Sequence, residues 1–378
     1  MPKPTSQRAA EKIAKVAARP NDLVTLWREV TDVLAEAIPH YWEPCFYSVD
    51  PASLLITSHF QENLAEFPPE CLTAEYYDDD VNQLADLARS ASGITTLHDA
   101  TRGDPRRSPR WHRNMKLGGD QEMIVALRTR SGEMWGAAAL YREPGRPLFT
   151  SDEKELLRSL APHLAEGTRR ALLVGAATDP EGLESPGLII LNDRGDVESA
   201  TPGTDRWLSE LPGGDADGAA LPPAVLSVAT RALRTAKSRD RPGEVALARV
   251  LSRGGTWVVL HGASLDSARE HRVAVIIEPA HPARIYPLLM SAYGLTERER
   301  DVTRLTLQGF STAQIADELV VSTHTVQQHL KSIFEKTGVR SRRDLVGKVF
   351  FTHYEPRFRD NEERVATQRP IRGGPAHR

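Results

Sequence analysis

The sequence predicts a multidomain protein in which two α+β modules precede an all-α module of four short helices. The chain has 378 residues, and at roughly 100–200 residues per domain this length fits two or three domains. Hairpin signals alternate with helical stretches as far as about residue 282. After Leu295 the strand signals stop, and four helix-start signals follow within about fifty-five residues.

Composition and charge exclude several classes of protein. Hydrophobic residues make up 40% and charged residues 26% of the chain, as in ordinary globular domains. The formal net charge is −3, so overall charge alone does not indicate a nucleic-acid partner. No apolar run approaches the roughly 18 residues of a membrane-spanning helix, and no secretory signal follows the basic N-terminus. We therefore expect a cytoplasmic protein without a membrane partner.

The cysteines and several aromatic residues each allow a structural and a functional interpretation. The two cysteines, Cys45 and Cys71, are too few for a disulfide framework or for paired Cys-x-x-Cys metal sites. Buried, inert thiols are the simpler interpretation, and a redox pair is the alternative. Four aromatic residues are candidates to line a pocket and fit a core equally well: Trp42, Trp111, Trp135 and Tyr141. We expect no metal site and no cofactor.

The chain begins with a basic segment and a predicted helix. Residues 1–20 carry five basic side chains and no apolar stretch, which predicts a disordered leader. The first α+β module is expected over residues 21–177. Its first helix is predicted from about Asp22 to Ile38, where apolar residues recur at three- and four-residue steps.

The middle of this module predicts a hairpin and a long exit helix. Strand patterns over 122–128 and 134–141 flank five residues containing Gly132, which indicates a hairpin. Thr150 and Glu153 form a capping-box pattern that starts a helix running to about residue 177.

Two further features of this module have expected roles. The apolar stripe of the exit helix, Leu156, Leu160 and Leu164, predicts a dimer seam that relays a signal, although a helix packed on its own domain has the same pattern. Residues 102–113 hold five arginines and two prolines and predict an exposed loop, a candidate lid.

A second α+β module is expected over residues 183–282. Its strand signals are Leu188–Leu191, two stretches flanking Ser252–Thr256, and Val273–Ile277. A helical module follows over residues 290–350, and residues 355–378 predict a disordered tail.

The helical module contains a predicted helix-turn-helix. Helices over 312–319 and 323–337 are separated only by Val320–Ser322, a connection typical of this motif. Val326, Leu330 and Ile333 are spaced to pack inward. The opposite face and its basic extension are the predicted DNA-binding residues: Thr323, His324, Gln327, Gln328, Lys331, Lys336 and Arg340.

These residues also carry a family resemblance. The ordered pattern Leu295-Thr-Glu-Arg-Glu299, Gly309-Phe-Ser311, Gln314-Ile-Ala316, Thr325-Val326, His329-Leu330 and Gly338-Val339 resembles the DNA-binding domain of LuxR-type transcriptional regulators. The resemblance implies that Gln327, Gln328 and Lys331 enter the major groove. The family usually has Lys at the position of Gln327. The resemblance also implies a dimer through the last helix, with contacts from Arg342, Leu345, Val346 and Val349.

The N-terminal modules resemble sensory domains. The first, through Leu140–Gly145 and Phe149–Glu153, is similar to a GAF domain, and the second, through Gly187–Asn192, is similar to a PAS domain. Such modules bind a small molecule or serve only to dimerise, and the sequence leaves both open.

We therefore expect a sequence-specific transcription regulator that binds an inverted repeat as a homodimer under control of its sensory region. One alternative is a ligand-sensing adaptor whose helical module binds another protein. A second is an enzyme in the N-terminal region, but Gly-x-Ser-x-Gly, His-Glu-x-x-His and phosphate-loop motifs are absent. No catalysis is expected.

Overall fold

The computed structural model describes residues 5–19, 21–61, 69–173, 186–192, 194–214, 221–237, 245–266, 271–280, 288, 290–291 and 293–346. It has two compact units. The first comprises residues 1–174, 182–254 and 258–278, and the second is made mainly of residues 279–378. The predicted tail lies outside the described residues. The predicted multidomain α+β and all-α architecture is confirmed.

The first unit begins with a five-stranded antiparallel sheet in the order β2-β1-β5-β4-β3. Its strands are β1 (Cys45–Val49), β2 (Ile56–Phe60), β3 (Ile94–Thr96), β4 (Gln121–Arg128) and β5 (Met134–Arg142). The predicted hairpin is confirmed as β4 and β5, which pair directly, with Glu122 opposite Tyr141. Since successive strand residues face opposite sides, β1, β4 and β5 contribute to a core on each face.

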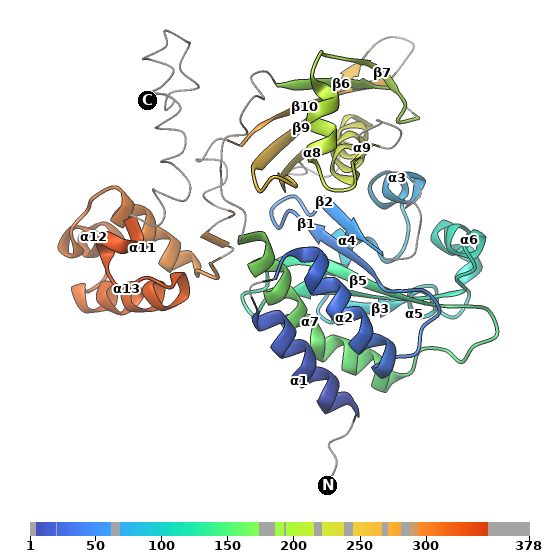
Figure 1. Ribbon diagram of the computed structural model, residues 1–378, viewed down its shortest axis with the longest axis horizontal. Coiled ribbons are helices and arrows are strands. Elements are labelled where there is room, and N and C mark those ends of the chain that lie inside the picture. The colour runs from blue at the N-terminus through green and yellow to red at the C-terminus, as the bar shows by residue number, and fades with distance from the viewer. Residues whose placement is uncertain are drawn as a thin grey trace. The chain divides into compact units, whose positions relative to one another are not determined.

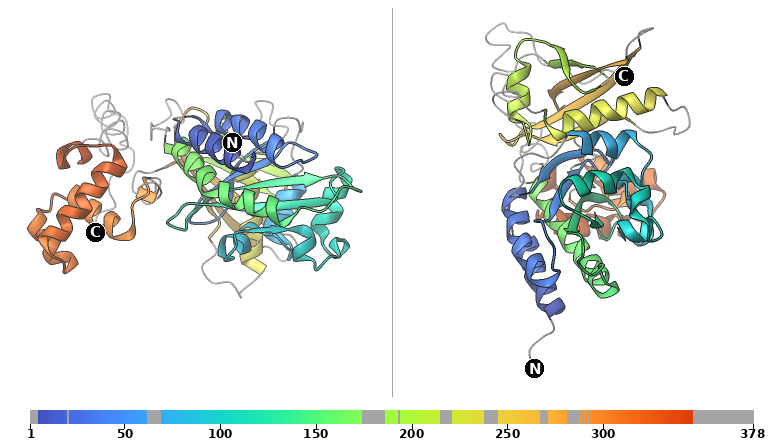
Figure 2. Two further views of the ribbon diagram at one scale, coloured as in Figure 1. Left: turned by 90° about the horizontal axis from the view of Figure 1, so that it is seen from below. Right: turned by 90° about the vertical axis from the view of Figure 1, so that its right-hand side faces the viewer.

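Three helices cover one face of this sheet: α1 (Thr5–Ala18), α2 (Leu23–Ala37) and α7 (Ser151–Leu173). Figures 1 and 2 show α1 and α7 side by side, and α1 packs on both α2 and α7. The predicted disordered leader is wrong for α1, because Ile13 is fully buried in this layer. The predicted dimer seam is also corrected, because Leu160 and Leu164 are buried against this unit's own core.

Shorter helices lie on the other face: α3 (Pro69–Tyr77), α4 (Leu84–Arg89), α5 (Leu97–Ala100), the 3₁₀ turn η1 (Pro105–Arg107) and α6 (Pro109–Lys116). The segment 102–113, predicted as an exposed arginine-rich loop, is therefore partly helical. Arg110 and Arg113 are the residues that overturn this prediction, because both side chains are largely buried in ion pairs.

A second five-stranded sheet in the same unit has the order β7-β6-β10-β9-β8. Its strands are β6 (Gly187–Leu191), β7 (Val197–Ala200), β8 (Leu247–Leu251), β9 (Trp257–Asp266) and β10 (His271–Pro279), with helices α8 (Thr204–Glu210) and α9 (Pro223–Lys237). Counted from its own first strand, each sheet has the order 2-1-5-4-3. The two predicted α+β modules thus share a strand topology.

The two sheets belong to one unit because their cores are continuous. One hydrophobic cluster runs from Tyr47 and Tyr141 in the first sheet to Val275 in the second. Helix α9 packs on α3 and β2. Asp50, whose side chain is fully buried, accepts hydrogen bonds from the backbone nitrogen, Nε and Nη2 of Arg249 at 2.8–2.9 Å. A buried carboxylate with this many donors ties the two modules together.

The second unit contains α11 (Glu297–Leu307), α12 (Thr312–Leu319) and α13 (Thr323–Thr337), followed by a short helical segment at 342–346. Helix α13 packs on both α11 and α12. Among the described residues of the chain, none of the helices combines the length and apolar character needed to span a membrane.

Candidate nucleic-acid interface and buried cavity

Local hydrogen bonds set the start of each helix in the second unit. Thr296 with Glu299, and Ser311 with Gln314, form reciprocal capping boxes at the starts of α11 and α12. The Ser322 hydroxyl accepts a hydrogen bond from the Thr325 backbone nitrogen at 3.0 Å and begins α13. The turn between α12 and α13 passes through Val320, whose φ is +55°. The predicted helix-turn-helix geometry follows from these caps.

Helix α13 has two chemically different faces. Val326 and Ile333 are fully buried and Leu330 nearly so. The opposite face carries five exposed polar side chains: Thr323, His324, Gln327, Gln328 and Lys331. One internal contact orders part of that face, because the Gln328 amide nitrogen lies 3.1 Å from His324 Nε2. The structure therefore presents these residues outward, and their contact with DNA stays a prediction.

Lys336 and Arg340, the other predicted DNA-binding residues, are also exposed. The Lys336 ammonium already has a partner, since it donates to Glu299 Oε2 at 2.6 Å. The Ser332 hydroxyl donates to Glu299 Oε1 at the same distance. Lys336 thus joins α13 to α11, a structural role that sequence analysis did not predict.

The residues predicted to contact a dimer partner differ in their exposure to solvent. Leu345 is fully buried in the single chain, and its contact with a partner stays a prediction. Val346 is 37% exposed and Arg342 is half-buried. Val349 lies outside the described residues.

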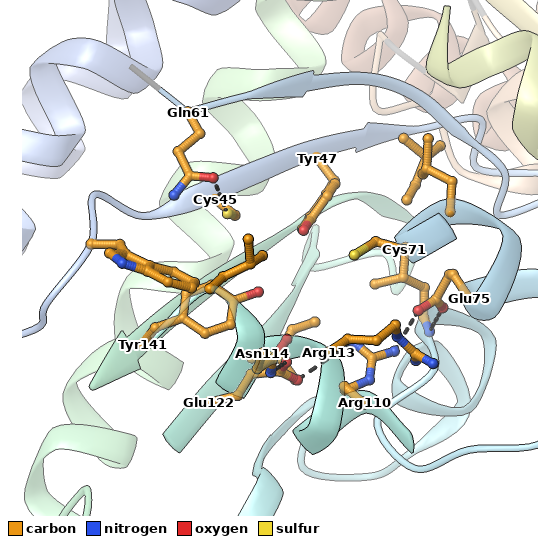
Figure 3. A pocket seen from close by; sticks show the side chains of 16 residues that line it. Cys45, Tyr47, Gln61, Cys71, Glu75, Arg110, Arg113, Asn114, Glu122 and Tyr141 are labelled. Atoms are coloured by element: carbon orange, nitrogen blue, oxygen red, sulfur yellow. Dashed lines mark hydrogen bonds and ion pairs between the residues drawn. The ribbon is translucent and has the colours of Figure 1, made fainter. Parts of the chain in front are cut away.

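A cavity of about 50 Å³ lies on the face of the first sheet opposite α1, α2 and α7. This volume has room for about three to five water molecules. Figure 3 shows its walls, which come from β1, β4, β5, α3 and α6. Of the aromatic candidates, Trp42 and Tyr141 line the cavity, whereas Trp135 is fully buried elsewhere and Trp111 donates to Asp120 at 2.9 Å.

Four charged side chains line this cavity, and three of them, Glu75, Arg110 and Glu122, interact with one another. Arg110 Nη2 lies 2.6 Å from Glu75 Oε2, and Arg110 Nη1 lies 3.5 Å from Glu122 Oε1. Asn114 Nδ2 donates to Glu122 Oε2 at 2.9 Å and Asn82 Nδ2 donates to Oε1 at 3.3 Å, so the Glu122 carboxylate is held in place. Sequence analysis missed this cluster, because its members lie far apart along the chain. The one available signal was the unbroken apolar run after Glu122 in β4, because such a run is typical of a strand covered on both faces and therefore places the carboxylate beneath a covering layer.

Burial favours the neutral form of one thiol and two phenols that line the cavity. Burial raises the pKa of the Cys45 thiol, and it also raises the pKa values of the Tyr47 and Tyr141 hydroxyls. Cys45 donates to Gln61 Oε1 at 2.8 Å. A thiol in this state is a poor nucleophile, which favours the inert interpretation of Cys45.

Comparisons with known proteins cover both ends of the chain. The chain is similar to the phycoerythrobilin-bound GAF domain from a cyanobacterial phytochrome, with 13% identity and a TM-score of 0.34 over 46% of this chain and 98% of that one. It is similar to a phycocyanobilin-bound GAF domain from a cyanobacterial phytochrome, with 14% identity, the same TM-score and the same coverage. Residues 294–349 match the model of the bacterial regulatory proteins of the luxR family. Residues 294–349 of this chain therefore form a helix-turn-helix domain of the luxR family of bacterial regulatory proteins.

Proposed function

We propose that this chain is a cytoplasmic transcription regulator that binds a specific DNA sequence as a homodimer under control of its N-terminal unit. The observation that carries the proposal is the division of α13 into a buried apolar face and an exposed polar one. A helix held this way can enter the major groove while its buried face stays anchored to α11 and α12.

The chemistry of the exposed face fits a duplex. Gln327 and Gln328 each offer an amide that can pair bidentately with adenine, and Lys331 offers a charge for phosphate or guanine. Two such helices related by a two-fold axis would lie in successive major grooves, about one helical turn apart. The operator should then be an inverted repeat.

The N-terminal unit is proposed to sense a small molecule without turning it over. The cavity on the first sheet supports this part of the proposal, because it combines aromatic walls with a few convergent polar groups. The second module, proposed to be PAS-like, shares the continuous core and can therefore respond to changes in the first.

Selection from a random pool of duplexes tests the proposal. The purified full chain should enrich an inverted repeat with half-sites about one turn apart. If the helical module instead binds another protein, no sequence will be enriched and the regulator proposal fails.

The role of Lys331 has a separate test. Lys331→Ala should weaken binding to all duplexes alike and reduce the slope of log affinity against log salt by about one, because one phosphate contact is lost. Gel-shift titrations at several salt concentrations measure this slope. Lys116→Ala removes an exposed lysine from α6 and should leave the slope unchanged. An unchanged slope for Lys331→Ala would remove Lys331 from the interface.

A further inference from the structure

The charges around the cavity on the first sheet are not balanced. Glu75 and Glu122 share the single guanidinium of Arg110, and the side chains of the two carboxylates are 8% and 1% exposed. Two buried carboxylates with one cation leave one negative charge in excess. Burial raises the pKa of Glu75, and Glu122 raises it further, although Arg110 opposes both.

Arg113, the other cation on the cavity wall, does not supply the missing charge. Its guanidinium lies between Asp78 at 3.5 Å and Asp80 at 3.4 Å. Asp80 is itself buried and accepts hydrogen bonds from the Ser108 hydroxyl and the Arg110 backbone nitrogen at 2.7 Å. The described cluster thus has four carboxylates and two guanidiniums.

The rest of the cavity suits a cation. Trp42 and Tyr141 form one wall, with ring centroids 5.1 Å apart, and Tyr47 forms part of another. Figure 3 shows the side chains of Tyr47, Tyr141, Cys71 and Glu122 around a common space. Aromatic faces attract cations, most strongly when water is excluded. Hydroxyl and carboxylate oxygens accept hydrogen bonds from an ammonium group.

Other classes of ligand fit less well. An anion would add a further negative charge beside the buried carboxylates of Glu75 and Glu122, which is costly where little water can screen the repulsion. A wholly apolar ligand would cover the carboxylates without satisfying them. The volume of about 50 Å³ limits the ligand to a few heavy atoms.

We propose that this cavity binds a small organic ammonium ion, with Glu122 and Glu75 supplying the counter-charge and the aromatic rings enclosing its carbon atoms. This inference rests on the proposed function, because it names the class of effector that the N-terminal unit senses.

Calorimetric titration of the full chain tests the proposal with three probes of nearly equal size. Ethylammonium chloride should bind and raise the thermal unfolding temperature. Ethanol and sodium acetate, added at equal concentration and with sodium chloride keeping ionic strength constant, should do neither. Equal stabilisation by acetate or by sodium chloride would overturn the proposal.

Three variants refine the test. Glu122→Gln removes the central carboxylate and should weaken ethylammonium binding by at least about tenfold. Because Glu122 is buried and this variant can fail to fold, Glu75→Gln provides a second test: it leaves Arg110 and Glu122 balanced and should weaken binding to a similar degree. Glu155→Gln removes a carboxylate exposed on α7 and should bind like the unmodified chain. Full affinity in a folded Glu75→Gln or Glu122→Gln chain would contradict the proposal.

This experiment does not depend on DNA. If ethylammonium fails to bind while the duplex selection succeeds, the ligand class is wrong and the regulator proposal stands. If ethylammonium binds and no duplex is enriched, the cavity assignment stands and the regulator proposal fails.

Discussion

Val320 adopts a backbone conformation that its side chain disfavours. Its φ of +55° and ψ of +50° lie in the left-handed region, which costs a residue other than glycine roughly 1–2 kcal/mol. A β-branched residue is unusual there. The side chain is 89% exposed, so burial does not compensate. The turn is enforced by the caps on either side, which place α13 against α12.

We expect Val320→Asn to stabilise the second unit by about 1 kcal/mol, because asparagine tolerates the left-handed region. Urea unfolding of the full chain measures the change in the free energy of unfolding. Val197→Asn, at a 49% exposed position on β7, is the control and should give no gain, because strands favour valine. A loss of stability in Val320→Asn would show that the valine side chain makes a favourable contact.

At the scale of single elements, local sequence patterns predicted where helices begin, but they did not predict which elements pack together. Both capping boxes of the second unit are present, because each needs only residues three apart. Helix α1 was missed even though Ala9, Ile13 and Val16 are spaced as a helical stripe. The composition of this segment predicts a basic leader, and its burial depends on α2 and α7, which the segment's own sequence does not reveal.

The same limit explains why the sequence did not predict the packing of the exit helix α7 or the ion pairs of the cavity. A stripe of leucines fits a dimer seam or an intramolecular core, and only the three-helix layer decides between them. The Arg110 pairs join residues 35 and 12 positions away, and no short-range pattern predicts such contacts. Sequence therefore predicted the helix-turn-helix and its outward residues, and it missed the charged wall of the cavity.

Glu299 connects two elements of the helix-turn-helix and gives their packing a pH dependence. Burial raises its pKa, but hydrogen bonds from Lys336, Ser332 and the Thr296 backbone nitrogen outweigh burial and hold the pKa below its usual value of 4.5. A carboxyl with a lowered folded-state pKa stabilises the fold above its unfolded-state pKa, and this contribution is lost as pH falls through the lowered value.

We expect Glu299→Gln to lower the free energy of unfolding by about 2 kcal/mol at pH 7, because it removes hydrogen bonds to a charged group. The difference from the unmodified chain should shrink as pH falls below 4.5, where the Glu299 carboxyl of the unfolded chain begins to take up a proton. Urea unfolding of the full chain at pH 7, 5 and 3.5 measures this trend. Glu335→Gln, at an exposed site of α13, should change stability by less than about 0.5 kcal/mol. A difference for Glu299→Gln that is independent of pH would exclude the ionic role of this residue.

At the scale of the N-terminal unit, α3 belongs to both modules. One side of α3 gives Cys71, Leu72 and Glu75 to the cavity. From α9, Arg234 Nη1 donates to the Tyr76 carbonyl oxygen at 3.1 Å, and Arg234 Nη2 donates to Asp79 at 3.0 Å. The second module therefore holds the C-terminal end of α3, while the Glu75 carboxylate of α3 faces the cavity. A ligand that interacts with Glu75 would therefore act directly on the contact between α3 and α9.

We expect ethylammonium to increase hydrogen-exchange protection in both α3 and α9 of the unmodified chain. Arg234→Ala should retain ethylammonium affinity within about twofold, because Arg234 does not line the cavity, yet the added protection should then be confined to α3. The modules stay joined in this variant, since Asp50 and Arg249 form a separate buried contact. Arg158→Ala, on the exposed side of α7, should behave like the unmodified chain. If α9 were protected equally in Arg234→Ala, the signal would pass through the remaining contacts of α9 with α3 and β2, or through those of β2 with β8.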